Sequence, residues 1–429
     1  MSIKITTWNI AWMHKLLNGS ERSARGGRLT DPDDIANLAK QRAQIARQIE
    51  LMDPDVVCIQ EGPSMRSMDK LEAFCNADLA GKWTLVPRAD DGSYRPPGIQ
   101  SICFLVKTVR WDELQPTMLP RDTWIAATEE ESRIDVRLAD SGEHKASWPI
   151  DNPLWMERRE AGQEKLARIE QELRDEFGID ENADDEEEAP NIPAGEHTHY
   201  RWPQVLTCTR DGHQFDVIGA HLKSKFVQQS LVRAAARLKQ KEKPTRSDRR
   251  KIREFELLAI NNRMKISTEA TNIRYFVDNR FRNEPNPAVF LVGDLNDGIG
   301  KEYFERRYLL HDLVSNLQGD VFFANRFLNH ALFDYAPAGE QTMRWSAEFD
   351  DVWDPHRSDR ILLDHIMFTQ GVVGADAFHN TGMRVRSKAG FVEHKHHVAA
   401  NRVFRPGEGE TSDHRPVSVI VDTSDDPIA

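Results

Sequence analysis

The sequence is poor in cysteine and lacks the close cysteine spacings that bind metals. Its 429 residues include four cysteines, Cys58, Cys75, Cys103 and Cys208. Three of them stand in apolar, strand-like runs, where a cysteine is usually a buried free thiol. A disulfide framework and a cysteine-based metal cluster are therefore not expected.

Long apolar runs and an N-terminal leader are also missing. No stretch of the sequence is long and apolar enough to form a membrane-spanning helix. A strand-like segment begins at Ile3, with no basic region, apolar region or cleavage site before it. We therefore expect a cytoplasmic protein with no membrane segment.

An excess of positive charge is absent too, since the net charge is −12. This total disfavours a general nucleic-acid binder, because a phosphate backbone demands local positive charge. The charge is uneven, however: acidic residues gather between Glu129 and Glu196, whereas Arg233 to Arg253 is strongly basic. A local basic surface is compatible with a negative total.

The apolar pattern predicts an α/β protein. Alternating apolar residues predict strands at 3–8, 56–61, 83–87, 99–106, 204–209, 214–220, 288–292, 361–368 and 416–421. Helical spacing predicts helices at 31–52, 64–79, 227–241, 246–281 and 301–309. Because strands alternate with helices and some neighbouring strands look antiparallel, we predict two mixed sheets packed face to face with helices outside.

Residues 121–194 break this pattern. A charged amphipathic helix is predicted at 157–177, and 180–189 is an acidic stretch of low complexity. We interpret 121–194 as an insertion within a single domain of residues 1–429.

Short polar motifs follow apolar runs from one end of the chain to the other. They are Thr-Trp-Asn-Ile at 7–10, Ile-Gln-Glu at 59–61, Gly-Ala-His-Leu-Lys-Ser at 219–224, Gly-Asp-Leu-Asn-Asp at 293–297, Leu-Asp-His-Ile at 363–366 and Ser-Asp-His-Arg-Pro at 412–416. A strand that ends in a polar residue delivers that side chain to the rim of its sheet. Hard oxygen ligands beside imidazoles suit Mg²⁺-assisted attack on a phosphate ester.

Three of these strand ends carry oxygen-bearing side chains. Asp294 and Asn296 lie two residues apart, so in an extended segment both face one side; the alternative is an Asx-turn. Glu61 closes a buried strand, where a carboxylate needs a cation or hydrogen-bond donors, and a salt bridge is the alternative. Asn9 is neutral, which suits orienting a ligand or capping a turn.

The histidines supply the remaining parts of a catalytic site. His414, with Asp413 beside it and Asp364 elsewhere, gives a carboxylate-oriented imidazole, in which the carboxylate fixes the tautomer and raises basicity. His221 ends another strand and is a candidate acid or phosphate ligand. One such histidine is usually structural, but two beside Asp294 and Glu61 favour chemistry.

Taken in order, these motifs resemble the endonuclease/exonuclease/phosphatase superfamily, which has the DNase I-like fold. The resemblance covers the chain apart from the insertion. It implies a four-layer α/β sandwich and a phosphoesterase that depends on Mg²⁺ or Mn²⁺.

The resemblance also implies roles for individual residues. Glu61 would bind the metal, Asn9 would hold metal or phosphate, and Asp413 would be a further carboxylate on the metal side. The other implied roles are water and phosphate positioning by Asp294 and Asn296, general base or transition-state stabiliser for His414 oriented by Asp364, acid or phosphate ligand for His221, and phosphate contact for Arg201.

The substrate is open between two classes. Lys223 and Lys225 follow His221, and with the basic segment up to Arg253 they suit a polyanionic backbone, so we expect a nuclease acting on DNA or RNA. A phosphatase or phosphodiesterase for a small or lipid phosphate ester is the alternative. A non-catalytic binding protein is disfavoured because the family's catalytic positions are intact. The cluster His394-Lys-His-His397 is interpreted as a loop near the site entrance.

Overall fold

The fold is given by a computed structural model of the chain. It describes residues 1–429 apart from 19–31, 65–66, 89–99, 129–167, 178–198, 200, 226, 228, 299–301, 309, 311, 335–342, 349–350, 352, 355, 406–407 and 425–429.

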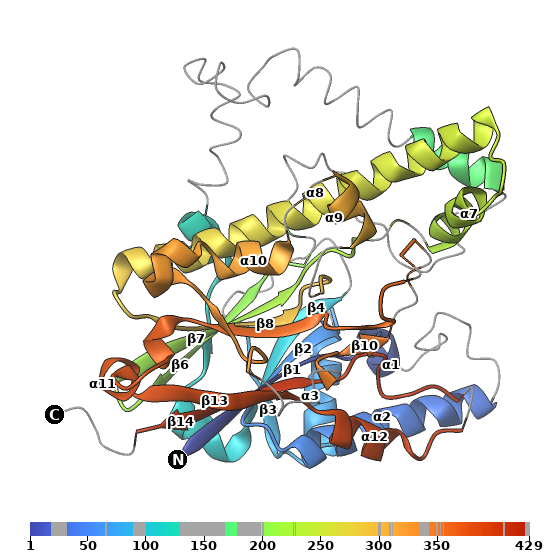
Figure 1. The fold of residues 1–429 in the computed structure, drawn as a ribbon. Coiled ribbons are helices and arrows are strands. Elements are labelled where there is room, and N and C mark those ends of the chain that lie inside the picture. Colours follow the sequence, from blue (N-terminus) through green and yellow to red (C-terminus); the bar gives the residue numbers. More distant parts are fainter. Residues whose placement is uncertain are drawn as a thin grey trace.

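Two six-stranded sheets form the centre of the molecule (Figure 1). The first sheet contains, in spatial order, β13 (Met383–Val392), β14 (Val417–Thr423), β1 (Ser2–Asn9), β2 (Val56–Gly62), β4 (Ser101–Lys107) and β3 (Trp83–Leu85). The second contains β5 (Thr117–Met118), β6 (Gln204–Arg210), β7 (His213–His221), β8 (Ala288–Asp294), β12 (Asp364–Phe368) and β9 (Asn329–His330). Both sheets are mixed, because β1 pairs with β2 and β7 with β8 in parallel while the other pairs are antiparallel.

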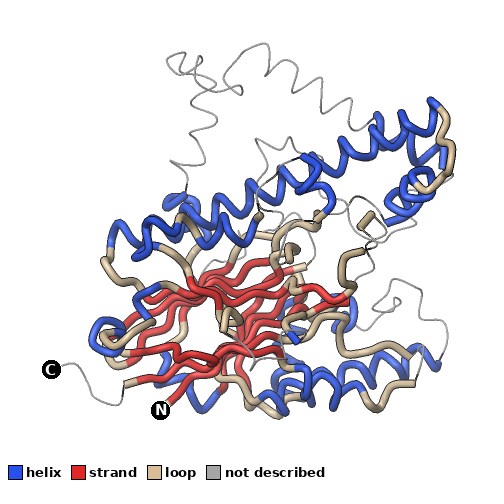
Figure 2. The backbone as a smooth tube through the Cα atoms, viewed as in Figure 1, coloured by secondary structure: helices blue, strands red, loops and turns tan. Residues whose placement is uncertain are grey.

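Helices cover the outer faces of both sheets (Figure 2). The labelled helices of the structure are α1 (Met13–Asn18), α2 (Pro32–Met52), α3 (Met68–Ala77), α4 (Trp111–Leu114), α7 (Gln229–Lys239), α8 (Arg246–Asn283), α9 (Tyr303–Tyr308), α10 (Leu313–Gln318), α11 (Ala377–Thr381) and α12 (His394–Asn401). Two further helical stretches span 121–128 and 168–177, and a two-stranded ribbon joins β10 (Ala347–Glu348) to β11 (Arg360–Ile361). Helices, sheet, sheet and helices make four layers, so the predicted α/β sandwich is confirmed.

Alternate side chains of each strand pack into different apolar cores. On β8, Phe290 and Val292 face the core between the two sheets, whereas Val289 and Leu291 pack under α8. The sheets approach closely at Gly219, where a Cβ would lie 2.7 Å from the Sγ of Cys58 on the facing sheet. Since side chains alternate with a period of two, the same parity continues to the strand ends and directs the last residues into the gap between the sheets.

Several predicted elements differ from the structure. The predicted strand 361–368 is two strands, β11 and β12, with a break at Leu362 and Leu363. The edge strand β13 was not predicted, because arginine, serine and lysine interrupt its apolar alternation and its register with β14 shifts between Val385 and Gly390. Charged, irregular edges of this kind protect a sheet from pairing with another chain.

The ends of the predicted insertion pack on the rest of the molecule. Trp124, in the helical stretch 121–128, is buried and stacks on Phe276 of α8 at 4.3 Å between ring centroids. Ile169 and Leu173, in the stretch 168–177, join an apolar cluster with α7 and α8. The acidic stretch 180–189 and Trp155 lie outside the described residues.

The histidine cluster was predicted to be a loop, and that prediction is wrong. His394 to His397 form the first half of α12, which packs against α2. His394 and His397 are buried, and His394 Nε2 donates to the carbonyl oxygen of Met343 at 2.7 Å. The cluster therefore serves packing of the outer helical layer.

All four cysteines are buried free thiols, as predicted. Within the described part of the chain, none of the helices combines the length and the apolar character needed to cross a membrane.

Candidate active site

Three strands of the second sheet bring polar side chains into one row. The register pairs His221 at the end of β7 with Asp294 at the end of β8, and Asp294 with Asp364 at the start of β12. All three are buried. Because they share the parity of the core residues between the sheets, their side chains meet in the gap between the two sheets.

The turn after β8 is fixed by its backbone. Gly293 has φ +143°, and a Cβ there would lie 1.8 Å from the carbonyl oxygen of Ala220, so only glycine fits. The amide of Asn296, which has φ +49°, donates to Asp294 Oδ1 at 2.8 Å, and its side chain donates to the carbonyl of Leu222 at 2.8 Å. The Asx-turn is therefore present, and it is also what orients the Asp294 carboxylate.

The first sheet contributes Asn9 from the end of β1. Its Nδ2 donates across the gap to Asp294 Oδ2 at 2.9 Å and lies 3.4 Å from Glu61 Oε1. The Oδ1 atom of Asn9 is buried and makes no hydrogen bond within the described structure. An unpaired buried oxygen is costly unless something else binds it.

Glu61 reaches the same place through a break in the strand. One extra residue of β2 stands opposite β4 between Ile59 and Gly62, and Glu61 has φ +60°. By strand parity Glu61 would point away from the gap, so the bulge and the left-handed backbone re-aim its carboxylate. Such strain in a non-glycine residue is typical of a functional position.

The Glu61 carboxylate is held by two donors. Its Oε2 accepts hydrogen bonds from the backbone N–H of Trp12 at 2.7 Å and from Gln100 Nε2 at 2.9 Å. Burial raises the pKa of Glu61 to about 7, despite the opposing charge of Arg201. A carboxylate with this pKa lacks enough positive charge for its degree of burial.

Arg201 stands behind this carboxylate. It donates to Oε1 of Gln100, whose amide in turn donates to Glu61. The Arg201 charge opposes the raised pKa of Glu61 and lowers the pKa of His221. Arg201 is thus brought to the predicted site, with Gln100 as the link.

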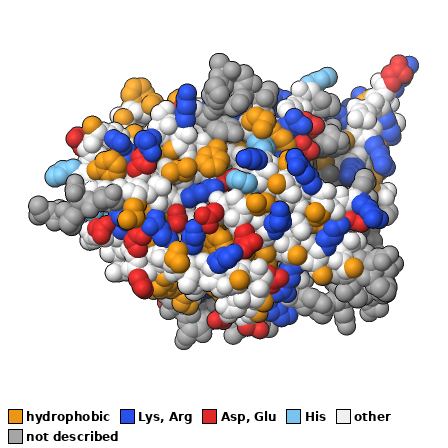
Figure 3. All heavy atoms as spheres, turned by 90° about the horizontal axis from the view of Figure 1, so that it is seen from below, with side chains coloured by type: hydrophobic (Ala, Val, Ile, Leu, Met, Phe, Trp, Pro, Cys, Tyr) orange, Lys and Arg blue, Asp and Glu red, His pale blue; other side chains and the backbone are white. Residues whose placement is uncertain are grey.

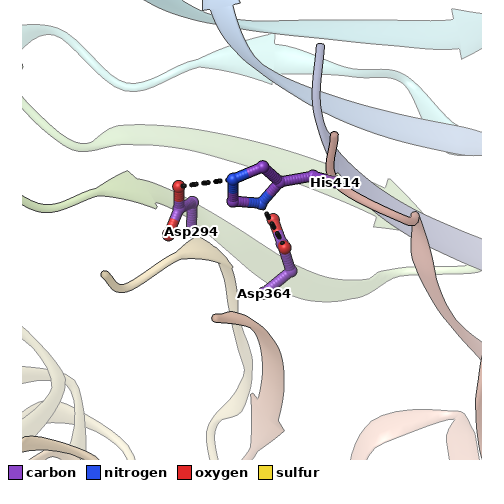
Figure 4. Close-up of side chains that lie close together, drawn as sticks. All are labelled: Asp294, Asp364 and His414. Atoms are coloured by element: carbon purple, nitrogen blue, oxygen red, sulfur yellow. Dashed lines mark hydrogen bonds and ion pairs between the residues drawn. The ribbon is translucent and has the colours of Figure 1, made fainter. Parts of the chain in front are cut away.

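His414 joins the row from the loop before β14 (Figure 4). Its Nδ1 and Asp364 Oδ2 are 2.7 Å apart, and its Nε2 lies 3.9 Å from Asp294 Oδ2. Ser412 anchors the loop, since its hydroxyl donates to the carbonyl of Asn9 at 2.7 Å and accepts from the His414 amide at 3.1 Å.

The charge state of His414 follows from its neighbours. Burial lowers its pKa, but the Asp364 and Asp294 carboxylates more than offset this effect and raise the pKa well above the ordinary value. For the Asp294 carboxyl group, burial has the opposite effect and raises the pKa to about 6. Near neutral pH these groups hold an imidazolium between two carboxylates.

His221 has the opposite character. Its Nε2 lies 3.7 Å from Asp294 Oδ2, while burial, Arg201 and His414 lower its pKa well below the ordinary value. It is a neutral imidazole, and its Nδ1 is buried without a hydrogen-bond partner in the described structure.

The two remaining predicted residues lie at the edge of this group. Asp413 is exposed, and its charge raises the pKa of both Glu61 and His414. Lys223 is half-buried, and its backbone amide donates to Glu269 at 2.7 Å. Lys225, which was expected to face a polyanion, is instead buried in ion pairs with Asp297 and Glu305.

Sequence reasoning missed a pair of imidazoles behind the site. His365 Nε2 donates to the Asp297 carbonyl at 2.8 Å, and its Nδ1 accepts from His330 Nε2 at 2.9 Å. His330 Nδ1 accepts from the Leu332 amide at 3.1 Å. The chain of bonds requires both rings to be neutral, and burial lowers both pKa values. His365 stood in a noted motif, but nothing in the sequence identified His330 as its partner.

His14 is a second missed residue. It lies on α1, directly after the first motif, and is buried beside Glu61. Burial, followed by the charge of Lys15, lowers its pKa to about 4. No spacing in the sequence relates His14 to the other motifs.

The residues present fit a hard divalent cation near Glu61 and Asn9. The Oδ1 atom of Asn9 has no hydrogen-bond partner in the described structure, and the buried carboxylate of Glu61 has too little positive charge around it. Both groups offer oxygen ligands of the kind that Mg²⁺ and Mn²⁺ prefer. Asp294, Asp364 and His414 also lie close enough to hold an ion. There, however, the imidazole–carboxylate hydrogen bond already occupies Nδ1 of His414.

The structure is a four-layer α/β sandwich, as the resemblance to the DNase I-like fold predicts. Its two mixed sheets pack face to face, and polar strand ends converge in the gap between them. No protein-family model and no curated protein matches the chain.

Solved structures do match. Truncated TDP2 from Caenorhabditis elegans is 11% identical with a TM-score of 0.43, over 99% of this chain and 98% of that chain. A Bacteroides thetaiotaomicron protein of the endonuclease/exonuclease/phosphatase family is 13% identical with a TM-score of 0.39, over 98% and 97%. The human Nocturnin catalytic domain with bound sulfate is 12% identical with a TM-score of 0.41, over 99% and 95%. The Bacteroides thetaiotaomicron protein is named as a member of the family that the motifs resemble. The activity and the substrate of this chain are inferred from its own residues.

Proposed function

We propose that the protein is a metal-dependent phosphoric ester hydrolase, and specifically a nuclease that hydrolyses phosphodiester bonds of DNA or RNA. The observation that carries the proposal is the in-register row of His221, Asp294 and Asp364, with His414 closing it from the other side of the gap. This set combines a neutral imidazole, a carboxylate of raised pKa and a charged imidazole within one buried site.

Glu61 and Asn9 would hold the Mg²⁺ or Mn²⁺ ion, with the exposed Asp413 on the same side. When bound, the ion supplies positive charge that polarises the phosphoryl group and offsets its developing negative charge.

The chain's own groups divide the remaining work. Asp294, oriented by the Asn296 amide and the Asn9 side chain, positions the attacking water and accepts its proton, which its raised pKa favours. The His414 imidazolium, held charged by Asp364, stabilises the negative charge on the phosphoryl oxygens.

Substrate contacts come from the neutral and basic groups around this centre. His221 donates an N–H to a phosphate oxygen without adding charge, and Arg201 and Lys223 add positive charge beside it. The water oxygen bonds to phosphorus as the ester P–O bond breaks, and the leaving oxygen takes up a proton from solvent, to which Asp294 in turn releases the proton of the attacking water. The products are a phosphate monoester and an alcohol.

The test is a cleavage assay with supercoiled plasmid, single-stranded DNA and RNA, each with Mg²⁺, Mn²⁺ or EDTA. Asp294→Ala serves as the inactive control, and bis(4-nitrophenyl) phosphate serves as a small diester. We expect metal-dependent cutting that the variant loses by a factor of at least about 10³.

Two results would contradict the proposal in different ways. Full activity of Asp294→Ala would overturn the site assignment. Hydrolysis of small esters without cutting of any polynucleotide would replace the nuclease by a small-ester phosphodiesterase.

A further inference from the structure

A helical arm projects beyond the sheets. We use this name for α7, the connection 240–245 and the first half of α8, 246–262. Figure 1 shows α7 and the start of α8 extending past the end of the sandwich. The arm has an apolar cluster of its own, separate from the cores around the sheets, in which Phe255 stacks on Trp353 at 4.9 Å.

The surface of the arm is basic. Its exposed arginines and lysines that form no ion pair with any described residue are Arg233, Arg237, Lys239, Lys243, Arg246, Arg249 and Arg253. Among them, Lys239 lies over the Tyr303 and Trp353 rings. On α8 these arginines are spaced by three and four residues, and on α7 by four, so each set forms a stripe along one helical face.

This charge does not serve helix stability. Like charges three or four residues apart destabilise a helix by a few tenths of a kcal/mol per pair. Arg246 and Arg249 also stand in the first turns of α8, where the helix dipole disfavours cations. A basic stripe that opposes both effects, in a chain of net charge −12, indicates a surface kept for an anionic partner.

Figure 3 shows the face of the molecule seen from below, on which Lys and Arg side chains are mixed with Asp and Glu side chains. By charge complementarity, the basic stripes of the arm suit a polyanion.

The arm is tied rigidly to the candidate active site. The chain runs from His221 through the buried Lys225 directly into α7. Lys225 pairs with Asp297, three residues after Asp294, and Arg263 of α8 pairs with Glu302, which faces Lys225 at 3.6 Å. From Arg263 to Arg246 the helix rises about 1.5 Å per residue, so the tip stands about 25 Å beyond this junction.

We propose that the helical arm is a second contact surface for a polynucleotide, whose phosphate backbone it binds outside the candidate active site. The inference rests on the proposed nuclease function. At about 3.4 Å per nucleotide along a strand, the distance of about 25 Å from the junction to the tip corresponds to roughly seven nucleotides beyond the site. The arm therefore makes the enzyme prefer long substrates and makes its binding dependent on salt.

The experiment compares Arg246→Gln/Arg249→Gln/Arg253→Gln with the wild type. The control is Lys395→Gln/Arg402→Gln, which removes an exposed charge from α12 and another directly after it, on the other side of the molecule. Substrates are a 30-nucleotide strand, a six-nucleotide strand and bis(4-nitrophenyl) phosphate, each at 50 and 200 mM salt.

For the arm variant we expect kcat/KM on the 30-mer to fall about tenfold, and the slope of log(kcat/KM) against log salt to shrink by up to about two, since each lost contact to a single strand removes about 0.7. Activity on the six-mer and the small diester stays at the wild-type value. Equal activity of variant and wild type on the 30-mer overturns the inference, as does an equal loss on all three substrates, which marks a structural effect.

Binding separates failure of the arm from failure of the proposed function. In an Asp294→Ala background, fluorescence anisotropy with a labelled 30-mer measures affinity without turnover. Weaker binding by the arm variant supports the inference even where the wild type does not cut. Binding that the arm substitutions leave unchanged, or no binding at all, overturns it.

Discussion

A single carboxylate, Asp364, controls the charge of His414. It lies 2.7 Å from Nδ1 and is the largest influence that raises the imidazole pKa. In Asp364→Asn the pKa of His414 falls, so the imidazolium is lost at a lower pH. We expect kcat to fall by about 10² to 10⁴ with KM little changed, and the alkaline limb of the pH–rate profile to move toward acid.

The pH profile distinguishes this role from a structural one. His379→Gln, an exposed histidine on α11, is the control and keeps both rate and profile. A uniform loss of rate in Asp364→Asn with an unmoved alkaline limb would mean that His414 does not act as the charged group.

Metal binding at Glu61 can be tested by a measurement that does not require turnover. Burial raises its pKa to about 7, so an ion beside it stabilises the folded state by mass action. We expect millimolar Mn²⁺ to raise the Tm of the wild type, and Glu61→Gln to remove most of that shift. An unchanged shift in the variant would place the ion elsewhere, for example among Asp294, Asp364 and His414.

At the scale of elements, α12 makes stability depend on pH through His397. Burial lowers the pKa of His397 from 6.5 to about 3, so the unfolded chain binds the proton first. This histidine's contribution is present above pH 6.5 and is lost progressively as the pH falls. Relative to His397→Gln, the wild type should lose about 1 kcal/mol of unfolding free energy between pH 7.5 and 5.5.

Urea unfolding at the two pH values measures this difference, with His379→Gln as the exposed control. The decisive observation is whether acidification lowers the unfolding free energy of the wild type more than that of His397→Gln. If acidification weakens His397→Gln as much as the wild type, His397 titrates alike in the folded and unfolded chain.

Strand ends were predictable from the sequence because an apolar run that stops at a polar residue is a local signal. Asn9, Asp294 and His414 were identified in this way, and the structure brings them together. Glu61 was found for the same reason, but its strand parity points the wrong way. The bulge that corrects this depends on pairing with β4, which no local pattern records.

Features decided by distant partners could not be predicted. Lys225 looks like a surface residue in sequence, yet Asp297 and Glu305 bury it. The strand β13 looks like a charged loop because an edge strand needs little apolar alternation. His394 and His397 look like part of a loop near the site entrance until α2 is placed against them.

At the scale of the whole molecule, both the stability and the candidate site depend on the distance between the two sheets. A Cβ at Gly219 would lie 2.7 Å from Cys58 Sγ and 2.9 Å from the Ile102 side chain, so in Gly219→Ala either these side chains or the facing sheets must shift. We expect a loss of about 1 to 3 kcal/mol in unfolding free energy and a loss of activity, because the site spans the gap.

A second substitution tests this cause. Cys58→Ala removes the nearest atom, so the double variant Cys58→Ala/Gly219→Ala should be more stable than the sum of the single changes predicts. Strict additivity in urea unfolding would show that the sheets adapt without strain.

The hydroxyl of Ser412 bonds to the carbonyl of Asn9, and β14 pairs with β1 along its length. The candidate site therefore joins two segments that lie 403 positions apart in the sequence. A fragment that ends before Ser412 has no His414 and no complete site, whatever else has folded. A separate peptide that contains β14 would have to rebuild the pairing with β1 before the two fragments together complete the site.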